Sequence, residues 1–175
     1  SITVNDRLGN RASDSAWIRV TPEGKIVINE IYYDDQGDDD VNFIELQGPA
    51  GEELTGCRLL GLRGADGENY LEIPLDGLVM PRDGFFVVSQ SAFVPHTDLI
   101  LPEADLLNGP DNLQLHCNKA LVDAVGYGGD DGIAWIFLGE GRPAPDGVAT
   151  SIGRDTSSSD SDDNSRDFTV QRQPT

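Results

Sequence analysis

Residues 26–46 constrain the fold more than any other stretch of the sequence. Two runs rich in Ile, Val, Tyr and Phe, at residues 25–33 and 41–47, flank a connection that contains five aspartates. These apolar residue types fit the pleated surface of a sheet, and the first run places apolar side chains on both of its faces. The aspartates cannot be core, because an unpaired buried carboxylate is too costly. The stretch therefore predicts two strands, the first of them interior, joined by an exposed acidic loop.

Short apolar runs separated by Gly, Pro, Asn and Asp continue through the rest of the chain. They lie at residues 54–62, 70–73, 84–90, 113–117, 120–127 and 133–138. The pair Asn118-Lys119 between two of them is suited to a tight hairpin turn. Helical periodicity is scarce. The pattern predicts an all-β fold, a β-sandwich of about eight or nine strands with negligible helix.

The length of 175 residues allows one domain with appended segments. Residues 1–24 are polar with short β-like pieces, and they are predicted to be a linker or the end of a preceding module with an added strand. Residues 25–175 are assigned to the sandwich, including an acidic C-terminal segment. This segment is rich in Ser and Asp from about residue 149, a composition typical of disorder. Phe168 and Val170 near its end nevertheless predict that it returns to pack.

The charge balance excludes two classes of partner. The chain has 31 acidic and 12 basic residues, which gives a net charge of −19. Such a field repels phosphate backbones and anionic membranes, so no nucleic acid partner is expected. Membrane insertion is not expected either, because no apolar run approaches the roughly 18 residues that a spanning helix needs. The same surface suits divalent cations and basic partners, or serves solubility alone.

The two cysteines, Cys57 and Cys117, are too far apart for a CxxC metal or redox motif. Both fall at apolar-side positions of predicted strands. They could form a disulfide between strands in an oxidising compartment, or they could be two buried free thiols. Both interpretations stay open, because the sequence does not give the distance between the two Cα atoms.

Two carboxylate-rich stretches are candidate calcium sites, since calcium takes six to eight oxygen ligands. In the C-terminal segment, Asp160, Asp162 and Asn164 have the alternating spacing of the first half of a calcium loop, with Asp155 before them and Asp167 after them. The segment lacks the Gly and Glu that complete an EF-hand. The candidates in the connection after the first strand are Asp34, Asp35, Asp38 and Asp40. The alternative for each stretch is a solvated acidic loop.

Catalytic signatures are weak in this sequence. His96 and His116 are the only histidines, and neither has a nucleophile motif near it. Glu30 and Glu45 form a carboxylate pair on neighbouring predicted strands. A paired acid/base site is one interpretation of this pair, and a structural role supported by hydrogen bonds is the other. We expect no enzymatic activity.

The order of several motifs resembles the lamin-tail domain family. The motifs are Asn29-Glu30-Ile31, Phe43-Ile44-Glu45-Leu46, Leu54-Thr55-Gly56-Cys57-Arg58-Leu59, and residues 83–88, 121–127, 151–154 and 160–168. The resemblance extends from about Gly24 to the C-terminus. The chain departs from the family at Cys57, where the pattern usually has Trp. The resemblance implies an immunoglobulin-like β-sandwich that has no intrinsic enzymatic activity as a rule.

Bacterial members of this family tend to lie in secreted or surface multidomain proteins, beside hydrolases, nucleases and adhesive modules. In nuclear lamins such a domain binds proteins and, in some cases, DNA, but the acidic surface fits the bacterial setting better. The resemblance thus implies a non-enzymatic interaction or anchoring module, extracellular or on the cell surface. The carboxylate spacing adds calcium as a candidate stabilising ion. The expected partners of the module are a protein or cell-surface molecule and neighbouring domains of a longer parent chain. The alternative is an accessory domain that positions substrate for an extracellular hydrolase or nuclease.

Overall fold

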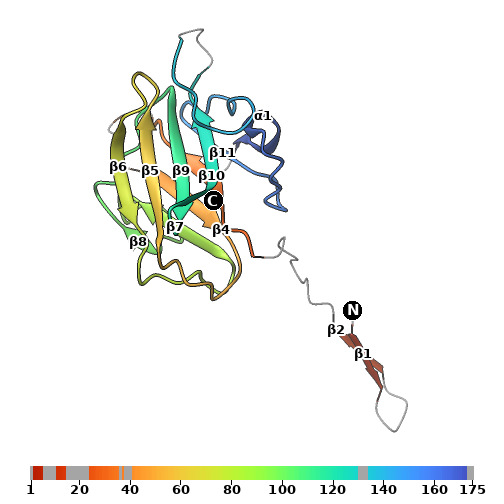
Figure 1. Cartoon of the computed structure of the whole chain (residues 1–175). Helices are drawn as coiled ribbons and strands as arrows, with labels where there is room; N and C mark the ends of the chain where they lie inside the picture. The colour runs from red at the N-terminus through yellow and green to blue at the C-terminus, as the bar shows by residue number, and fades with distance from the viewer. Residues whose placement is uncertain are drawn as a thin grey trace.

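The computed structural model describes residues 24–35, 37, 41–129 and 134–172, together with the backbone of residues 2–5 and 11–14. Two sheets lie one in front of the other (Figure 1). The first has four strands in the order β10 (Ala120–Tyr127), β9 (Asp111–Cys117), β5 (Cys57–Arg63) and β6 (Asn69–Pro74). The second has six in the order β12 (Thr169–Gln171), β11 (Ser151–Gly153), β3 (Val27–Tyr32), β4 (Phe43–Gln47), β7 (Phe85–Ser89) and β8 (Leu99–Ile100).

All neighbouring strands in these sheets are antiparallel except β7 and β8, which are parallel. A separate pair is formed by β1 (Ile2–Asn5) and β2 (Arg11–Asp14). The described part of the chain thus contains twelve strands and one four-residue helix, α1 (Asn164–Asp167). The prediction of an all-β fold is confirmed. The two sheets hold ten strands in place of the expected eight or nine, because β8, β11 and β12 are too short to show a period in the sequence.

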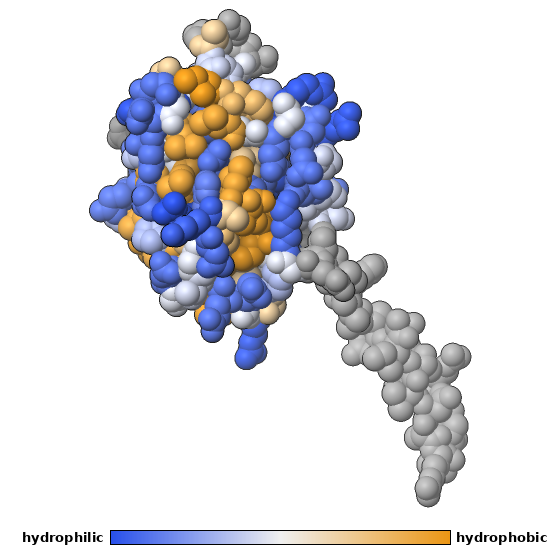
Figure 2. Space-filling view, viewed as in Figure 1, coloured by the Kyte–Doolittle hydropathy of each residue, from blue (hydrophilic) through white to orange (hydrophobic). Residues whose placement is uncertain are grey.

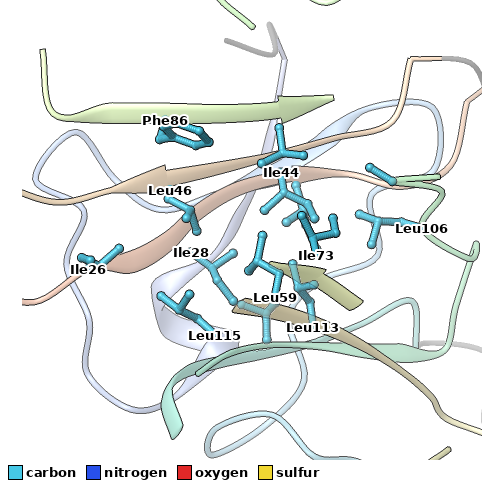
Figure 3. Close-up of a cluster of buried hydrophobic side chains, with 14 of the residues drawn as sticks. Ile26, Ile28, Ile44, Leu46, Leu59, Ile73, Phe86, Leu106, Leu113 and Leu115 are labelled. Carbon is cyan, nitrogen blue, oxygen red and sulfur yellow. The ribbon is translucent and has the colours of Figure 1, made fainter. Parts of the chain in front are cut away.

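One hydrophobic core fills the space between the two sheets (Figure 3). Alternate residues of each strand point into it, as the two-residue period of a strand requires. The six-stranded sheet contributes Ile28, Ile31, Ile44, Leu46 and Phe86, and the four-stranded sheet contributes Leu59, Ile73, Leu113 and Leu115. All of these side chains are buried, and burial of apolar surface is the main term that holds the two layers together.

The two strands predicted around the first acidic connection are β3 and β4, which pair directly with each other. β3 lies between β11 and β4, so the prediction of an interior strand is confirmed. Its register shifts between Ile28 and Glu30, which lets both Ile28 and Ile31 face the core. Asp38 and Asp40 of the connection lie outside the described residues.

The hairpin predicted at Asn118-Lys119 joins β9 to β10, and both turn residues have the positive φ that a tight hairpin turn requires (52° and 69°). Cys57 and Cys117 lie opposite each other on β5 and β9 and are joined by a disulfide. The bridged state, one of the two that the sequence left open, is therefore the one in the structure.

Residues 134–138 do not form the strand that was predicted for this stretch. They lie across the outer face of the four-stranded sheet, where the Asn112 amide accepts from the Leu138 N–H (2.7 Å) and donates to the Ile136 carbonyl (3.0 Å). The stretch fits there because Gly126 has no side chain: a Cβ at that position would lie 2.3 Å from the ring of Phe137. A side chain thus takes the place of a neighbouring strand.

Within the part of the chain described, no helix is long and apolar enough to cross a membrane.

Candidate functional site

The Arg154 guanidinium lies at the centre of a buried cluster of charges where the two sheets meet at one edge. Arg154 directly follows β11, and its side chain is fully buried. Its Nη2 donates to both carboxylate oxygens of Asp123 on β10, at 3.0 and 3.1 Å, and its Nε donates to the Ile28 carbonyl on β3 at 2.9 Å. Asp123 also accepts from the Ile28 N–H at 2.7 Å. This buried ion pair therefore ties the four-stranded sheet to the six-stranded sheet.

The other side of the guanidinium faces the acidic C-terminal segment. Nη1 of Arg154 donates to the Ser159 carbonyl at 2.8 Å and lies 3.3 Å from a carboxylate oxygen of both Asp160 and Asp167. The ring of Phe168 stacks 4.7 Å from the guanidinium carbon and is itself buried in the core. The segment that composition assigns to disorder is thus folded around one cation.

The carboxylates of this segment also accept hydrogen bonds from its own backbone. Asp167 accepts from the N–H and the hydroxyl of Ser161, at 2.9 and 2.6 Å. Asp155 accepts from the N–H groups of Ser157 and Ser159, both at 3.0 Å. These hydrogen bonds from backbone N–H groups, of which the one from Ser159 has the largest effect, hold the pKa of Asp155 below its ordinary value. The Ser/Asp composition therefore builds turns in which each carboxylate holds nearby amides.

Asn164 completes the backbone hydrogen bonds at the edge of β10. Its side chain is fully buried and donates to the Ala124 carbonyl at 2.8 Å. Its Oδ1 accepts from the N–H groups of Gly126 and Glu140, both at 3.0 Å. The amide of Asn164 thus takes the place of a further strand, and it covers an edge that would otherwise expose unpaired polar groups.

Three carboxyl groups converge beside Arg154: Asp123, Glu140 and Asp160 each offer an oxygen within 4.8 Å of the others. Among the described residues this is the one group of three or more acidic, His or Cys side chains gathered so closely. Lys25, just before β3, forms an ion pair with Asp160. The three carboxyl groups thus lie beside two cations, Lys25 and Arg154.

The proton content of the cluster follows from burial and mutual repulsion. Burial, and then the charges of Asp123 and Asp160, raise the pKa of Glu140 to about 8. Burial opposes a positive charge on Lys25, but the hydrogen bond and charge of Asp160 outweigh it and raise the pKa of Lys25. Burial also raises the pKa of Asp160, but the Lys25 hydrogen bond and the Arg154 charge lower it overall. At neutral pH the cluster thus holds a proton on Glu140 and an ion pair between Lys25 and Asp160.

The predicted calcium ligands are only partly brought together. Of the C-terminal set, Asp160 joins the cluster, while Asp162 is exposed and Asp155, Asn164 and Asp167 hold the contacts given above. In the first stretch, Asp34 accepts from the Asn108 amide and Asp35 accepts from the Tyr32 hydroxyl. Calcium binding stays a prediction for both stretches.

Sequence reasoning missed Asp123, Glu140 and Arg154 as members of this cluster. Two of them carry a signal that could have been read. Asp123 is the one charged residue of β10, and Arg154 is a cation at the start of a Ser/Asp-rich segment. An isolated charge in an apolar strand requires an opposite charge in the folded protein, because an unpaired one is too costly to bury.

Glu30 and Glu45 are buried and lie opposite each other on β3 and β4. Glu45 accepts from the Asn29 amide at 2.7 Å, and Glu30 accepts from the hydroxyl of Ser151. A cavity of about 450 Å³ beside Glu45 is also lined by His96, Asp83, Phe85, Val87, Thr97 and Asp98. His116 lies on the other sheet, within hydrogen-bond distance of Gln114 (2.9 Å).

No protein-family model matches the chain, and no curated protein or solved structure matches it either.

Proposed function

We propose that this chain is a non-enzymatic interaction or anchoring module with an immunoglobulin-like sandwich of the lamin-tail type. We place it in a secreted or surface multidomain bacterial protein. One observation carries the proposal: in a protein with a net charge of −19, apolar side chains gather on the outer face of the four-stranded sheet (Figure 2). An exposed apolar patch on an otherwise highly charged protein is typical of a protein interaction site.

The apolar outer face is formed by β5, the β9–β10 hairpin and the stretch at residues 134–138. Leu121 is 51% exposed and Ile136 is 42% exposed. Leu60 and Leu62 of β5 lie between them and are half-buried. Because these residues come from three segments held by hydrogen bonds and by the disulfide, the face is rigid before a partner arrives. A rigid face loses little conformational entropy on binding.

The two arginines beside this face each form an ion pair with a carboxylate. Arg58 pairs with Glu72, and Arg63 pairs with Asp66, at 3.4 and 3.3 Å. Lys119 lies at the tip of the adjacent hairpin. The negative electrostatic field of the chain is therefore weaker at this face, and a partner surface with an apolar centre can approach it. The partner that fits is a protein with an apolar patch rather than a polyanion.

The disulfide between Cys57 and Cys117 supports the extracellular part of the proposal, because disulfides persist in oxidising compartments. The hydrogen bonds that Glu30 and Glu45 accept support its non-enzymatic part, since they give these carboxylates a structural role.

Peptide selection on the folded chain tests the binding face. Peptides are selected from a randomised displayed library, and their Kd values are measured for the unmodified chain, for Leu121→Asp combined with Ile136→Asp, and for Val148→Asp as a control at another exposed apolar residue (61%). We expect the double variant to weaken binding at least tenfold and the control to leave it unchanged. Peptides that bind all three chains equally would contradict the proposed face.

A hydrolase screen tests the non-enzymatic part of the proposal independently. The unmodified chain is expected to show no turnover of ester, glycoside or phosphodiester substrates. Turnover that is lost in Glu30→Gln or Glu45→Gln would show that the chain is an enzyme.

A further inference from the structure

Lys25, Asp160 and Glu140 bring an amine, a carboxylate and a protonated carboxyl group to one place. Nζ of Lys25 contacts Oδ2 of Asp160, and the two side chains are 40% and 11% exposed. A carboxyl oxygen of Glu140 lies within 4.8 Å of one of Asp160. The Lys25–Asp160 contact joins residues 135 positions apart, one just before the first strand of the sandwich and one between its last two. These three groups are what amide formation between two side chains requires.

Asp160 is also activated from its other side. Its Oδ1 lies 3.3 Å from Nη1 of Arg154, a cation that is fully buried and cannot lose its proton. A fixed cation at a carboxyl oxygen draws electrons from the carbon and stabilises the negative charge that appears on oxygen when a nucleophile attacks. Asp160 is therefore held between the amine on one oxygen and a stabilising guanidinium on the other.

We propose that Lys25 and Asp160 form an intramolecular amide bond, with Glu140 as the group that transfers protons during its formation. The nitrogen of Lys25 bonds to the Cγ carbon of Asp160, and one C–O bond of Asp160 breaks. The ammonium loses two of its three protons, and the departing oxygen leaves with both of them as water. The reaction is a condensation without change of redox state, and it needs no other reactant.

Glu140 has a place in each proton transfer. Attack requires a neutral amine, so one proton first passes from Lys25 to Asp160 along their contact. Glu140 then gives its proton to the departing oxygen and takes one from the nitrogen, and it ends in its starting form. The ion pair is the resting form, so we expect the bond to form slowly. It forms once, after folding, because the folded chain holds the amine and the carboxyl group in contact.

The bond would anchor the start of the sandwich to its C-terminal segment. It would close a loop of more than a hundred residues and so remove a large part of the freedom of the unfolded chain. For a module that carries load between neighbouring parts of a longer protein, such a bond resists unfolding from the ends. This inference does not depend on the partner of the apolar outer face.

Intact-mass measurement of the reduced full chain tests the proposal directly. After incubation at neutral pH, we expect the chain to be lighter than its sequence by the mass of one water molecule. Trypsin should leave residues 20–58 joined to residues 155–166, because a modified Lys25 is no longer cleaved. A chain that keeps its full sequence mass after prolonged incubation would overturn the proposal.

Variants separate the roles of the three residues. Lys25→Arg should restore the full mass, whereas the matched control Lys119→Arg should still lose water. Asp160→Asn should lose ammonia instead of water, because the leaving group is then an amine. Glu140→Gln should fold and slow bond formation at least tenfold. Formation at an unchanged rate in that variant would overturn the role given to Glu140, and loss of water in Lys25→Arg would show that the bond lies elsewhere.

Discussion

The two acidic stretches of this chain look alike in composition and differ in structure. The first, residues 34–40, connects two strands, and its described aspartates accept hydrogen bonds from Asn108 and Tyr32. The second, residues 155–167, is closed around the buried guanidinium of Arg154 and ends in the buried ring of Phe168. In the second stretch, a buried arginine and backbone amides neutralise the carboxylates, and this is what holds the segment folded.

This comparison also shows what holds the C-terminal segment in place. Its apolar content is too low to fold it by hydrophobic burial, apart from Phe168. The segment is instead held by two side chains. One arginine forms ion pairs with three aspartates, and one asparagine forms hydrogen bonds with the edge of β10. Variants that remove these two side chains are therefore expected to have much larger effects than changes in the first stretch.

The largest effect is expected from Arg154→Met. Removing the guanidinium leaves Asp123 buried without its opposite charge, and the loss of one partner of a buried pair costs about 3–5 kcal/mol of unfolding free energy. Urea denaturation measures the change. The control is Arg142→Met, whose pair with Asp163 is exposed and is expected to contribute less than about 1 kcal/mol. Equal losses in the two variants would contradict the central place of Arg154.

The next largest effect is expected from Asn164→Ala. The change removes a donor to the Ala124 carbonyl and an acceptor for two N–H groups, all of them buried or half-buried. We expect a loss of roughly 2–3 kcal/mol, since buried backbone groups are left without partners. Ser165→Ala, one residue further on the exposed side of α1, is the matched control and should cost less than about 1 kcal/mol. A similar cost in both variants would argue that Asn164 does not complete the strand edge.

The pH dependence of the cluster gives a further prediction. The pKa of Glu140 is about 8 in the folded chain and has its ordinary value of 4.5 in the unfolded chain. Between these values the folded state binds a proton that the unfolded state has released, so stability falls as pH rises from about 4.5 to about 8 and levels off above that range. Glu140→Gln should remove this fall. Denaturation midpoints at a series of pH values check it, and an unchanged slope in the variant would assign the dependence to another group.

The smallest effects are expected in the first stretch and from calcium. Asp34→Asn removes the charge from an exposed hydrogen bond and should cost less than about 1 kcal/mol. Calcium is expected to raise the melting temperature of the C-terminal segment by less than the variants above lower it, because Arg154 already lies against two of its aspartates. Melting curves with calcium and with a chelator measure this. A rise of more than about 5 °C that Asp162→Asn abolishes would show that the segment binds an ion as its spacing predicts.

The sequence predicts the framework of this molecule better than its charge cluster. Alternating apolar residues locate β3, β4, β7 and the β9–β10 hairpin, because each of these strands has a core-facing side. Residues 134–138 show the limit of that signal. They have the residue types of a strand, but Asn112 and the absence of a side chain at Gly126 place them on top of the sheet. No local pattern contains that information.

The charge cluster could not be predicted for a similar reason. Asp123, Glu140 and Asp160 come from separate segments, and they meet only because β10 packs against β3 while β3 pairs with β11 in the other sheet. The 160–164 spacing that predicts a calcium loop is a local pattern, and in the structure its members point to different partners: Asp160 to Lys25 and Arg154, and Asn164 to β10. The prediction that the segment returns to pack is confirmed for Phe168, which lies in the core, but not for Val170, which is 45% exposed.

Hydrogen–deuterium exchange of peptides that cover residues 155–168 tests the central claim most directly. If Arg154 folds this segment, the amides of Ser157, Ser159, Ser161 and Phe168 are protected to a degree comparable with the β-strands, and Arg154→Met abolishes that protection while the strands of the four-stranded sheet keep theirs. Exchange at the rate of an unstructured chain in the unmodified protein would contradict the account, since the acidic segment would then be what its composition alone indicates.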